Sequence, residues 1–441
     1  MVTSDGLVSS DTHIDLIPSK NIADAAEEVT NSKAKRKGDP LFFMTEEMQK
    51  LSTPWSISSI RAGQIDIKNL PAGVILDAAA GSGVQLIAFS MGLKRPALGI
   101  EIDEEVAKLC AANMYINADK NDLQRTMDRV LIGDGTKSEE AMDAFWKSLR
   151  NAGTRAHPPI AMLHLDPARP RDAQNHHIDE MQPSLKNLLS SWSKFLQVGP
   201  RGPAVLLDLS PRLDGQQRNM VDSILETVFP GVPLTWEWLS QGGGRVDRLS
   251  VWVGSISSKS SHRCIRVGRK NIMAKIEGLP NKSELVELSK PPPFGSWISI
   301  IDASLIESGL QEAWLKNVIP PGCGHSWLRL KGRRPLLIHT EPLLEHENSN
   351  DFIVCSGKVV QHRLSAPELR TVDQVAAAAL RYEINKVTLR CNMDPEMHPK
   401  IQRKLDFELK GKEGSKAFMI DIDLDRGQSS HPLYIVCKED N

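Results

Sequence analysis

The sequence predicts an α/β fold, a mostly parallel sheet covered by helices, followed by a smaller α+β module. From Ala72 onward, short apolar segments alternate with amphipathic ones, which is the pattern of parallel strands joined by helical crossovers. The chain has 441 residues, enough for two cores with room for a tail and a linker. Its 40% hydrophobic and 25% charged content is ordinary for globular chains. We therefore expect two folded domains.

Composition excludes several classes of protein. Apolar runs such as Pro71–Ala80 and Ala204–Leu209 are far shorter than the roughly 20 residues that span a bilayer. Met1–Lys37 lacks the apolar core of a secretory signal, so the expected compartment is the cytoplasm. The six cysteines form no CxxC pair, which predicts reduced, structural thiols. The net charge of -1 does not by itself indicate that the chain binds nucleic acid.

The chain divides into four expected segments. Residues 1–37 are polar and lack aromatic residues, which predicts a mobile tail. A first domain is expected over 38–254. Residues 255–292 contain two Ser-Ser pairs and end within the proline run Pro291–Pro293, which is typical of a linker and the start of a second domain. The second domain is expected over 293–441.

The entry to the first domain carries a helix signal. Asp39–Phe43 adds apolar weight, and Thr45 precedes Glu46 and Glu47. This order predicts an N-cap followed by acids in the first helical turn.

The first domain is expected to hold seven strands in a Rossmann-like sheet, the last two close enough to form an antiparallel edge. Helices are expected at Val84–Met91 and Glu104–Asn117. The strands are expected at Val74–Ala79, Ala97–Ile102, Arg129–Ile132, Ile160–Leu165, Ala204–Leu209, Leu234–Leu239 and Leu249–Val253.

The second domain is expected to be a small α+β module. Helices are expected near Ala303–Leu315, near Ala366–Tyr382 and from Asp394-Pro395. Its strands are expected at Trp297–Ile301, Lys386–Cys391, Ala417–Ile422 and Leu433–Cys437.

A glycine turn after the first strand is the strongest functional signal. Asp77 ends a buried strand, and Gly81 and Gly83 lie in the turn to a helix, where a cofactor could rest against bare backbone. A dinucleotide fingerprint would place a third glycine where Leu86 stands, and an acid before the glycines suits a pyrophosphate poorly. The cationic amino group and sulfonium of S-adenosylmethionine (SAM) would welcome Asp77.

Two further acids follow the next strands. Glu101 lies about 20 residues past the glycine turn, where an acid can accept both ribose hydroxyls, and Asp134 could take the adenine amino group. Each acid alone is more often a solvated or capping residue. Three at successive strand ends of one sheet edge indicate a ligand site. Residues beside these acids complete the predicted SAM site: Ala79, Ile102 and Gly135.

The fourth strand ends in Asp166 and Pro167, where an acceptor would meet the methyl group. Methyl transfer is an in-line displacement, so the protein must align the nucleophile and receive a proton if the acceptor is an amine. The Asp166 carboxylate and the Pro167 carbonyl could do both, although Asp-Pro can also simply end a strand. Arg169 and Arg171 are candidates for an anionic substrate group, or are surface charges.

Several further residues bear on stacking, covalent or metal chemistry. Phe43 or Trp55 is a candidate substrate-stacking ring, though an aromatic beside a helix start is more often core. The chain has no Pro-Cys dipeptide, which argues against covalent cysteine catalysis and favours a nitrogen acceptor. His176-His177 and the Cys323/His325 pair lack two further nearby ligands, so no metal is expected.

These residues resemble SAM-dependent methyltransferases that carry a C-terminal THUMP-like domain, distantly similar to trimethylguanosine synthase. The resemblance covers most of the chain after Lys37. Its carriers are the segments Asp39–Thr45, Asp77–Gly83, Asp166–Arg169, Trp236–Gly244, Arg248–Trp252 and Asn385–Phe407.

The resemblance implies a class I methyltransferase sheet, SAM binding at the residues above, and an acceptor motif at Asp166–Arg169. Two positions depart from the family pattern. Pro170 stands where a second arginine is usual, and Ala168 cannot stack on a base as the aromatic of the synthase does. Cap hypermethylation is therefore not implied.

THUMP-like domains are similar to modules that present RNA, so the resemblance implies methylation of an RNA base nitrogen, in tRNA or rRNA. A basic-leaning strip with interspersed acids agrees with this or is an ordinary solvated surface. Two alternatives remain: a methyltransferase for protein or small molecules, and a non-catalytic, SAM-sensing RNA-binding scaffold. The strip comprises Lys386, Arg390, Lys400, Arg403, Lys404, Lys410 and Lys412.

Overall fold

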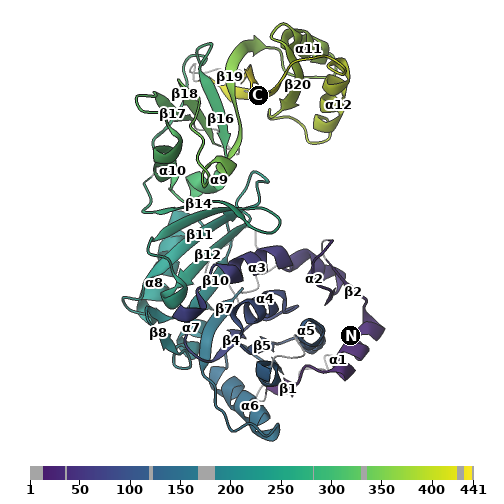
Figure 1. The fold of residues 1–441 in the computed structure, drawn as a ribbon, viewed down its shortest axis with the longest axis vertical. Coiled ribbons are helices and arrows are strands. Elements are labelled where there is room, and N and C mark those ends of the chain that lie inside the picture. The colour runs from purple at the N-terminus through teal and green to yellow at the C-terminus, as the bar shows by residue number, and fades with distance from the viewer. Residues whose placement is uncertain are drawn as a thin grey trace, which may run out of the picture. The chain divides into compact units, whose positions relative to one another are not determined.

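The computed structural model describes residues 13–34, 37–118, 123–166, 184–281, 283–328, 335–424 and 432–439. The chain forms two compact units (Figure 1). The first unit comprises the residues up to 237 together with 248–261 and 268–271. The second comprises 238–247, 262–267 and 272–441.

A ten-stranded sheet has the strand order β1-β6-β5-β4-β7-β10-β12-β11-β13-β14. The strands β6, β5, β4, β7 and β10 are parallel, and β12 runs antiparallel to β10. The chain moves outward from β4 to β6 and returns on the other side of β4 at β7, so a topological switch point lies between β4 and β7. The bounds are β1 Ile14–Leu16, β4 Val74–Asp77, β5 Ala97–Glu101, β6 Arg129–Ile132, β7 Ile160–Leu165, β10 Val205–Leu209, β11 Leu234–Ser240, β12 Arg248–Val253, β13 His262–Val267 and β14 Ile272–Gly278.

All seven expected strands are present, but the expected count and the expected edge are wrong. β1 pairs antiparallel with β6, and β13 and β14 continue the sheet beyond β11. These last two strands lie inside 255–292, where a linker and the start of the second domain were expected. Charged residues such as Arg263, Arg266 and Lys275 interrupt their apolar pattern, yet Cys264 and Ile265 are fully buried.

Helices cover both faces of the sheet. α4 packs beside α3 and α5, and α7 packs beside α6 and α8 (Figure 1). As expected, the Thr45 side chain accepts a hydrogen bond from the Met48 amide and begins α2. The helix bounds are α1 Lys20–Val29, α2 Glu46–Leu51, α3 Trp55–Gly63, α4 Val84–Leu93, α5 Glu104–Asn117, α6 Ser138–Asn151, α7 Leu185–Ser193 and α8 Gly215–Val228. Two short hairpins accompany them: β2 Ser32–Lys33 with β3 Phe42–Phe43, and β8 Val198–Gly199 with β9 Gly202–Pro203.

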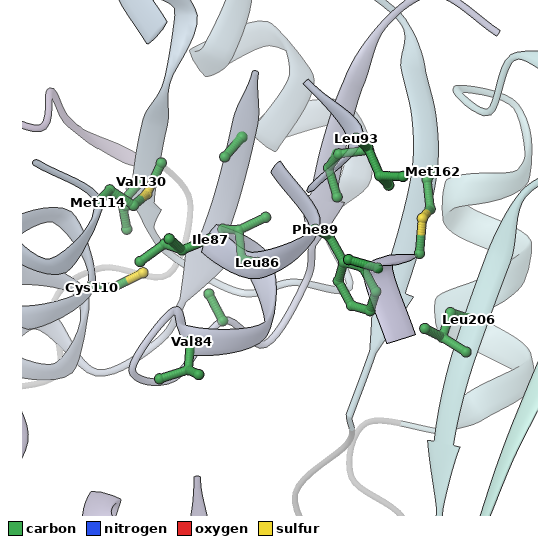
Figure 2. Packing of buried hydrophobic residues seen from close by; sticks show 14 of the residues in the cluster. Val84, Leu86, Ile87, Phe89, Leu93, Cys110, Met114, Val130, Met162 and Leu206 are labelled. Carbon is green, nitrogen blue, oxygen red and sulfur yellow. The ribbon is translucent and has the colours of Figure 1, made fainter. Parts of the chain in front are cut away.

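The core between the sheet and α3, α4 and α5 is apolar. Figure 2 shows Leu86, Ile87 and Phe89 of α4 among buried residues of neighbouring elements. Side chains of a strand alternate between faces, so one residue from each central strand enters this core. These strand residues are Ile75 (β4), Met162 (β7), Leu206 (β10) and Trp252 (β12).

The expected tail is partly folded. Residues 13–34 contain β1, α1 and β2, and α1 buries Ala23 and Ala26 against Leu109 and Ala112 of α5. The expectation failed because small alanines spaced three apart supply this buried face, and alanine gives little hydrophobic signal beside the surrounding charges.

The second unit contains an eight-stranded mixed sheet of order β15-β17-β18-β16-β19-β22-β21-β20. Three cores lie on it: one under α11 and α12, one centred on β16, β21 and β22, and one in which α9 and α10 pack against β16, β17 and β18. The strands are β15 Leu285–Val286, β16 Trp297–Ile301, β17 His325–Leu328, β18 Leu336–His339, β19 Ile353–Leu364, β20 Ile384–Leu389, β21 Ser415–Asp423 and β22 Pro432–Lys438. The helices are α9 Ala303–Glu307, α10 Gln311–Val318, α11 Val372–Leu380 and α12 His398–Glu408.

The expected helices of this unit are shorter in the structure. The helix expected at Ala303–Leu315 is broken into α9 and α10 at Gly309, which has a φ of +71°. The helix expected at Ala366–Tyr382 begins only at Val372, after Pro367. Within the described ranges, no helix combines the length and apolarity needed to span a bilayer.

Candidate functional site

The turn after β4 is open on one side and tightly packed on the other. Gly81 and Gly83 both have positive φ, +50° and +76°, which glycine adopts without strain. A Cβ at Gly83 would lie 2.8 Å from the Cys110 Sγ of α5, whereas a Cβ at Gly81 would meet nothing within 4 Å. Gly83 therefore serves packing, and the open space lies beside Gly81.

Glu101, at the end of β5, faces this turn. Its carboxylate accepts hydrogen bonds from the Gly81 amide at 2.9 Å and from the Asp103 amide at 3.1 Å. Burial, together with the charge of Asp77, raises the pKa of Glu101 above its usual range despite these hydrogen bonds. The structure thus brings Glu101 to the glycine turn, as the sequence predicts.

The loop after β6 packs against the same turn. A Cβ at Gly135 would lie 2.1 Å from the Ala78 carbonyl oxygen, so only glycine allows this approach. Asp134 Oδ1 accepts hydrogen bonds from the Thr136 amide at 2.9 Å and its hydroxyl at 2.7 Å. Of the remaining predicted cofactor residues, Ile102 is 73% exposed and Ala79 donates its amide to Asp77 Oδ1 at 3.1 Å.

Asp77 itself is buried and paired with His164 of β7. Its Oδ2 lies 2.7 Å from His164 Nδ1, and His164 Nε2 lies 3.2 Å from Oδ2 of Asp208 on β10. The sheet register explains the meeting, since Asp77 is opposite His164 and each polar residue lies two positions after an apolar core residue of its own strand. A polar layer therefore caps the apolar core at the carboxyl ends of the strands.

Arg61 of α3 enters this layer from the helical side. Its side chain is fully buried, and its Nη1 donates to Asp208 Oδ2 at 2.8 Å while Nη2 pairs with Asp208 Oδ1. Ser250 of β12 contacts both partners, accepting from Arg61 at 3.1 Å and donating to Asp208 at 2.8 Å. Such a fork-to-carboxylate pair is both strong and geometrically specific.

The protonation states of His164 and Asp208 in this layer depend on the charged groups that they contact. Burial acts against protonation of His164, but the charge of Asp77 and hydrogen bonds to Asp208 and Asp77 outweigh it and raise the pKa of His164 to about 10. Burial likewise acts to raise the pKa of Asp208, yet Arg61 and His164 hold it well below its usual range. At neutral pH His164 is a cation between two carboxylates.

Gln85 of α4 connects Arg61 to Asp166. Its Oε1 accepts a hydrogen bond from Arg61 Nη1 at 2.7 Å, and its Nε2 donates to Asp166 Oδ2 at 3.3 Å. Asp166 lies directly after β7, at the edge of the sheet where Asp77 ends β4. The predicted residues Pro167, Arg169 and Arg171 lie outside the described residues, as do His176 and His177.

Phe43 does not offer a stacking face, which corrects that expectation. It is 3% exposed and packs with Ala23, Leu109 and Ala112. Its backbone is clamped by the Asn113 side chain, which accepts from the Phe43 amide at 2.6 Å and donates to its carbonyl at 3.0 Å. The structure supports the other interpretation, that Phe43 is a core residue.

Sequence reasoning missed His164, Asp208, Arg61 and Gln85. A signal was available for two of them, because His164 and Asp208 interrupt strands that are otherwise apolar and buried. Buried charged residues need partners. Gln85 interrupts an apolar helix and Arg61 is the charged residue of a helix rich in serine, but nothing in the sequence indicates that these two side chains meet.

The site can hold a cationic ligand against two carboxylates. Glu101 bonds the Gly81 amide, and the buried Asp77 ends the strand before the turn. The negative charges of both residues would repel an anionic pyrophosphate. In the described part of the chain, no cluster of three or more His, Cys, Asp or Glu side chains could hold a metal ion.

No family model and no curated protein sequence matches the chain. Several solved structures resemble part of it. A precorrin-6y C5,15-methyltransferase from Geobacter metallireducens is 11% identical, with 48% of this chain and 93% of that one covered and a TM-score of 0.29. An O-methyltransferase from Bacillus cereus in complex with SAH is 14% identical (54% and 93% covered, TM-score 0.27). Trm1 from Pyrococcus horikoshii with S-adenosyl-L-methionine is 14% identical (50% and 58% covered, TM-score 0.27).

Proposed function

We propose that the chain is a SAM-dependent methyltransferase. One observation carries the proposal: Asp77 and Glu101 flank an open glycine turn at the carboxyl edge of a parallel sheet, with Glu101 held by the Gly81 amide. Ligands of open α/β sheets bind at this edge, near the topological switch point. A ligand with a positive charge and a ribose fits two carboxylates there.

The residues fit SAM better than a dinucleotide. Asp77 would face the cationic amino acid part, Glu101 the ribose hydroxyls and Asp134 the adenine amino group. Because Glu101 is drawn toward its neutral form by burial and by Asp77, a cation placed between the two acids would stabilise both charged forms. A pyrophosphate would have the opposite effect.

Bound SAM would supply an electrophilic methyl group, and the chain's task is to place a nucleophile in line with it. Asp166, at the end of β7, is on the same edge as Asp77 and is the proposed acceptor-side carboxylate. It would accept a hydrogen bond from an N–H of the substrate and so orient the nitrogen lone pair. Pro167 would contribute its carbonyl oxygen, and Arg169 and Arg171 would bind an anionic substrate group.

The proposed acceptor is a nitrogen of an RNA base, in tRNA or rRNA. Six residues of the basic strip are exposed on β20, α12 and the segments next to them, while Lys404 is half-buried and bonds the Leu369 carbonyl. A concentration of cations on segments that follow one another in the chain suits a phosphate backbone. The six exposed residues are Lys386, Arg390, Lys400, Arg403, Lys410 and Lys412. The assignment of residues 293–441 as a THUMP-like domain remains part of this proposal.

The test is incubation of the purified chain with methyl-labelled SAM and total RNA, followed by nucleoside analysis. We expect label in one modified nucleoside, and its loss in Asp166→Ala. Label in protein or in small molecules instead of RNA would favour the alternative substrates. Binding of SAM and RNA without any transfer would favour the non-catalytic scaffold.

A further inference from the structure

Asp166 and Asp77 are joined by an unbroken chain of hydrogen bonds, which is buried except at its half-buried Asp166 end. From the acceptor side it runs from Asp166 to Gln85 at 3.3 Å and from Gln85 to Arg61 at 2.7 Å. Arg61 then binds Asp208 at 2.8 Å. From Asp208 the chain passes through His164 to Asp77, at 3.2 Å and 2.7 Å.

The direction of each hydrogen bond in the first part is fixed by chemistry. A guanidinium only donates, so the Gln85 amide must turn its oxygen toward Arg61. Its nitrogen then points to Asp166 and can only donate there. Gln85 is 8% exposed and Arg61 is 0% exposed, so neither side chain has room to exchange this arrangement for hydrogen bonds to water.

We propose that Gln85 and Arg61 are positioning residues of the transfer reaction, which hold the Asp166 carboxylate in the orientation that receives the acceptor nitrogen. The inference rests on the proposed function. A neutral amide between the guanidinium and Asp166 matters, because a direct Arg61–Asp166 ion pair would make the carboxylate a poorer hydrogen-bond acceptor for substrate. Both Nη atoms of Arg61 instead bond Asp208, and Nη2 also bonds Ser250, so Gln85 is the group that holds Asp166 by a direct hydrogen bond.

If Gln85 is a positioning residue, its replacement should lower the methyl-transfer rate without lowering SAM affinity. A purely structural role would not produce this difference. Gln85→Met keeps the length of the side chain and removes both hydrogen bonds. We expect SAM affinity by calorimetry to stay within about twofold, because the glycine turn and Glu101 are untouched. Methyl transfer to total RNA at saturating SAM should fall about tenfold or more, because the acceptor-side group loses its fixed orientation.

Ser90→Ala is the matched control. Ser90 lies on the same helix, is fully buried and bonds the Arg95 carbonyl at 2.6 Å, so its loss should lower the melting temperature without lowering the transfer rate. If Gln85→Met fails to fold, Arg61→Lys gives a second test. It retains the charge beside Asp208 but cannot bond Gln85 and both Asp208 oxygens at once, and we expect the same split between affinity and rate.

Wild-type transfer rates in folded Gln85→Met or Arg61→Lys would overturn the inference, as would a loss of SAM affinity that accounts for the whole fall in rate. Failure of the proposed function is seen separately, in the wild-type chain, as an absence of SAM binding or of methyl transfer to any acceptor.

Discussion

At the residue scale, His164 lies between two buried carboxylates, those of Asp77 and Asp208. Both of its ring nitrogens face buried carboxylates, so its cationic form stabilises the fold. Replacement of either partner would leave a buried charge without compensation, which is more costly than loss of a surface pair.

Because of this arrangement, we expect the stability of the fold to decrease as the pH becomes alkaline. The pKa of His164 is raised to about 10 in the folded chain, against about 6.5 when unfolded. Its contribution is therefore fully present below pH 6.5 and is lost as the pH rises toward 10. We expect the free energy of unfolding, measured by urea denaturation, to fall over this interval more steeply in the wild type than in His164→Gln. Equal slopes in the two proteins would contradict the account.

Residue-level prediction from sequence succeeded where local order fixes position. Asp77, Glu101 and Asp134 follow strands, and parallel strands place their ends at one edge, so their grouping could be predicted. The pairing of Arg61 with Asp208 depends on which helix covers which strands, and no local pattern encodes it. Phe43 was misjudged because its burial depends on α1 and on Asn113, both distant in sequence from its own strand.

At the element scale, the two glycines of the turn after β4 are expected to have different roles: Gly83 in packing and Gly81 in ligand binding. Both Gly81→Ala and Gly83→Ala place a side chain at positive φ, at a cost of about 1–2 kcal/mol. Only the Gly83 variant also meets Cys110 at 2.8 Å. We expect Gly83→Ala to lower the free energy of unfolding by about 1–3 kcal/mol more than Gly81→Ala.

We expect the opposite order of the two variants for SAM affinity. A methyl group at Gly81 enters the open side of the turn, so we expect the Gly81 variant to weaken SAM binding although it is the more stable of the two. If Gly81→Ala bound SAM like the wild type, the open side of the turn would not be the cofactor site.

The N-terminal helix is an integral part of the first unit. Ala26 is 4% exposed and packs against α5, so Ala26→Arg should destabilise the chain by about 2 kcal/mol or more. Glu27→Arg, one position later and exposed, is the control and should change stability by less than about 0.5 kcal/mol. Thermal melts of the two variants distinguish a packed helix from a tail, for which both would behave alike.

Elements with strong apolar content were predicted from sequence, and weak ones were not. The seven predicted strands are present, and large apolar residues make up most of each one or alternate along it. β1 has three residues, and β13 and β14 mix charges with buried positions, so only pairing with neighbouring strands reveals them.

At the scale of the whole molecule, the chain has two units with separate cores, and the proposal assigns them separable tasks. If the basic strip binds RNA, Lys400→Glu with Arg403→Glu should weaken RNA binding about tenfold or more and reduce its salt dependence, with SAM affinity unchanged. Lys147→Glu with Lys186→Glu, an equal charge change at exposed positions of the first unit, is the control. If both double variants weakened RNA binding equally, the effect would come from the net charge of the chain and not from the basic strip.

The most direct test of the cofactor site is titration calorimetry with SAM. We expect measurable binding to the wild type, and a loss of about 1–3 kcal/mol of binding free energy in both Asp77→Ala and Glu101→Ala, because each removes a charged ligand group at the glycine turn. Glu104→Gln, exposed on α5, should bind like the wild type. Unchanged affinity in both alanine variants, or no heat of binding with the folded wild-type chain, would contradict the account.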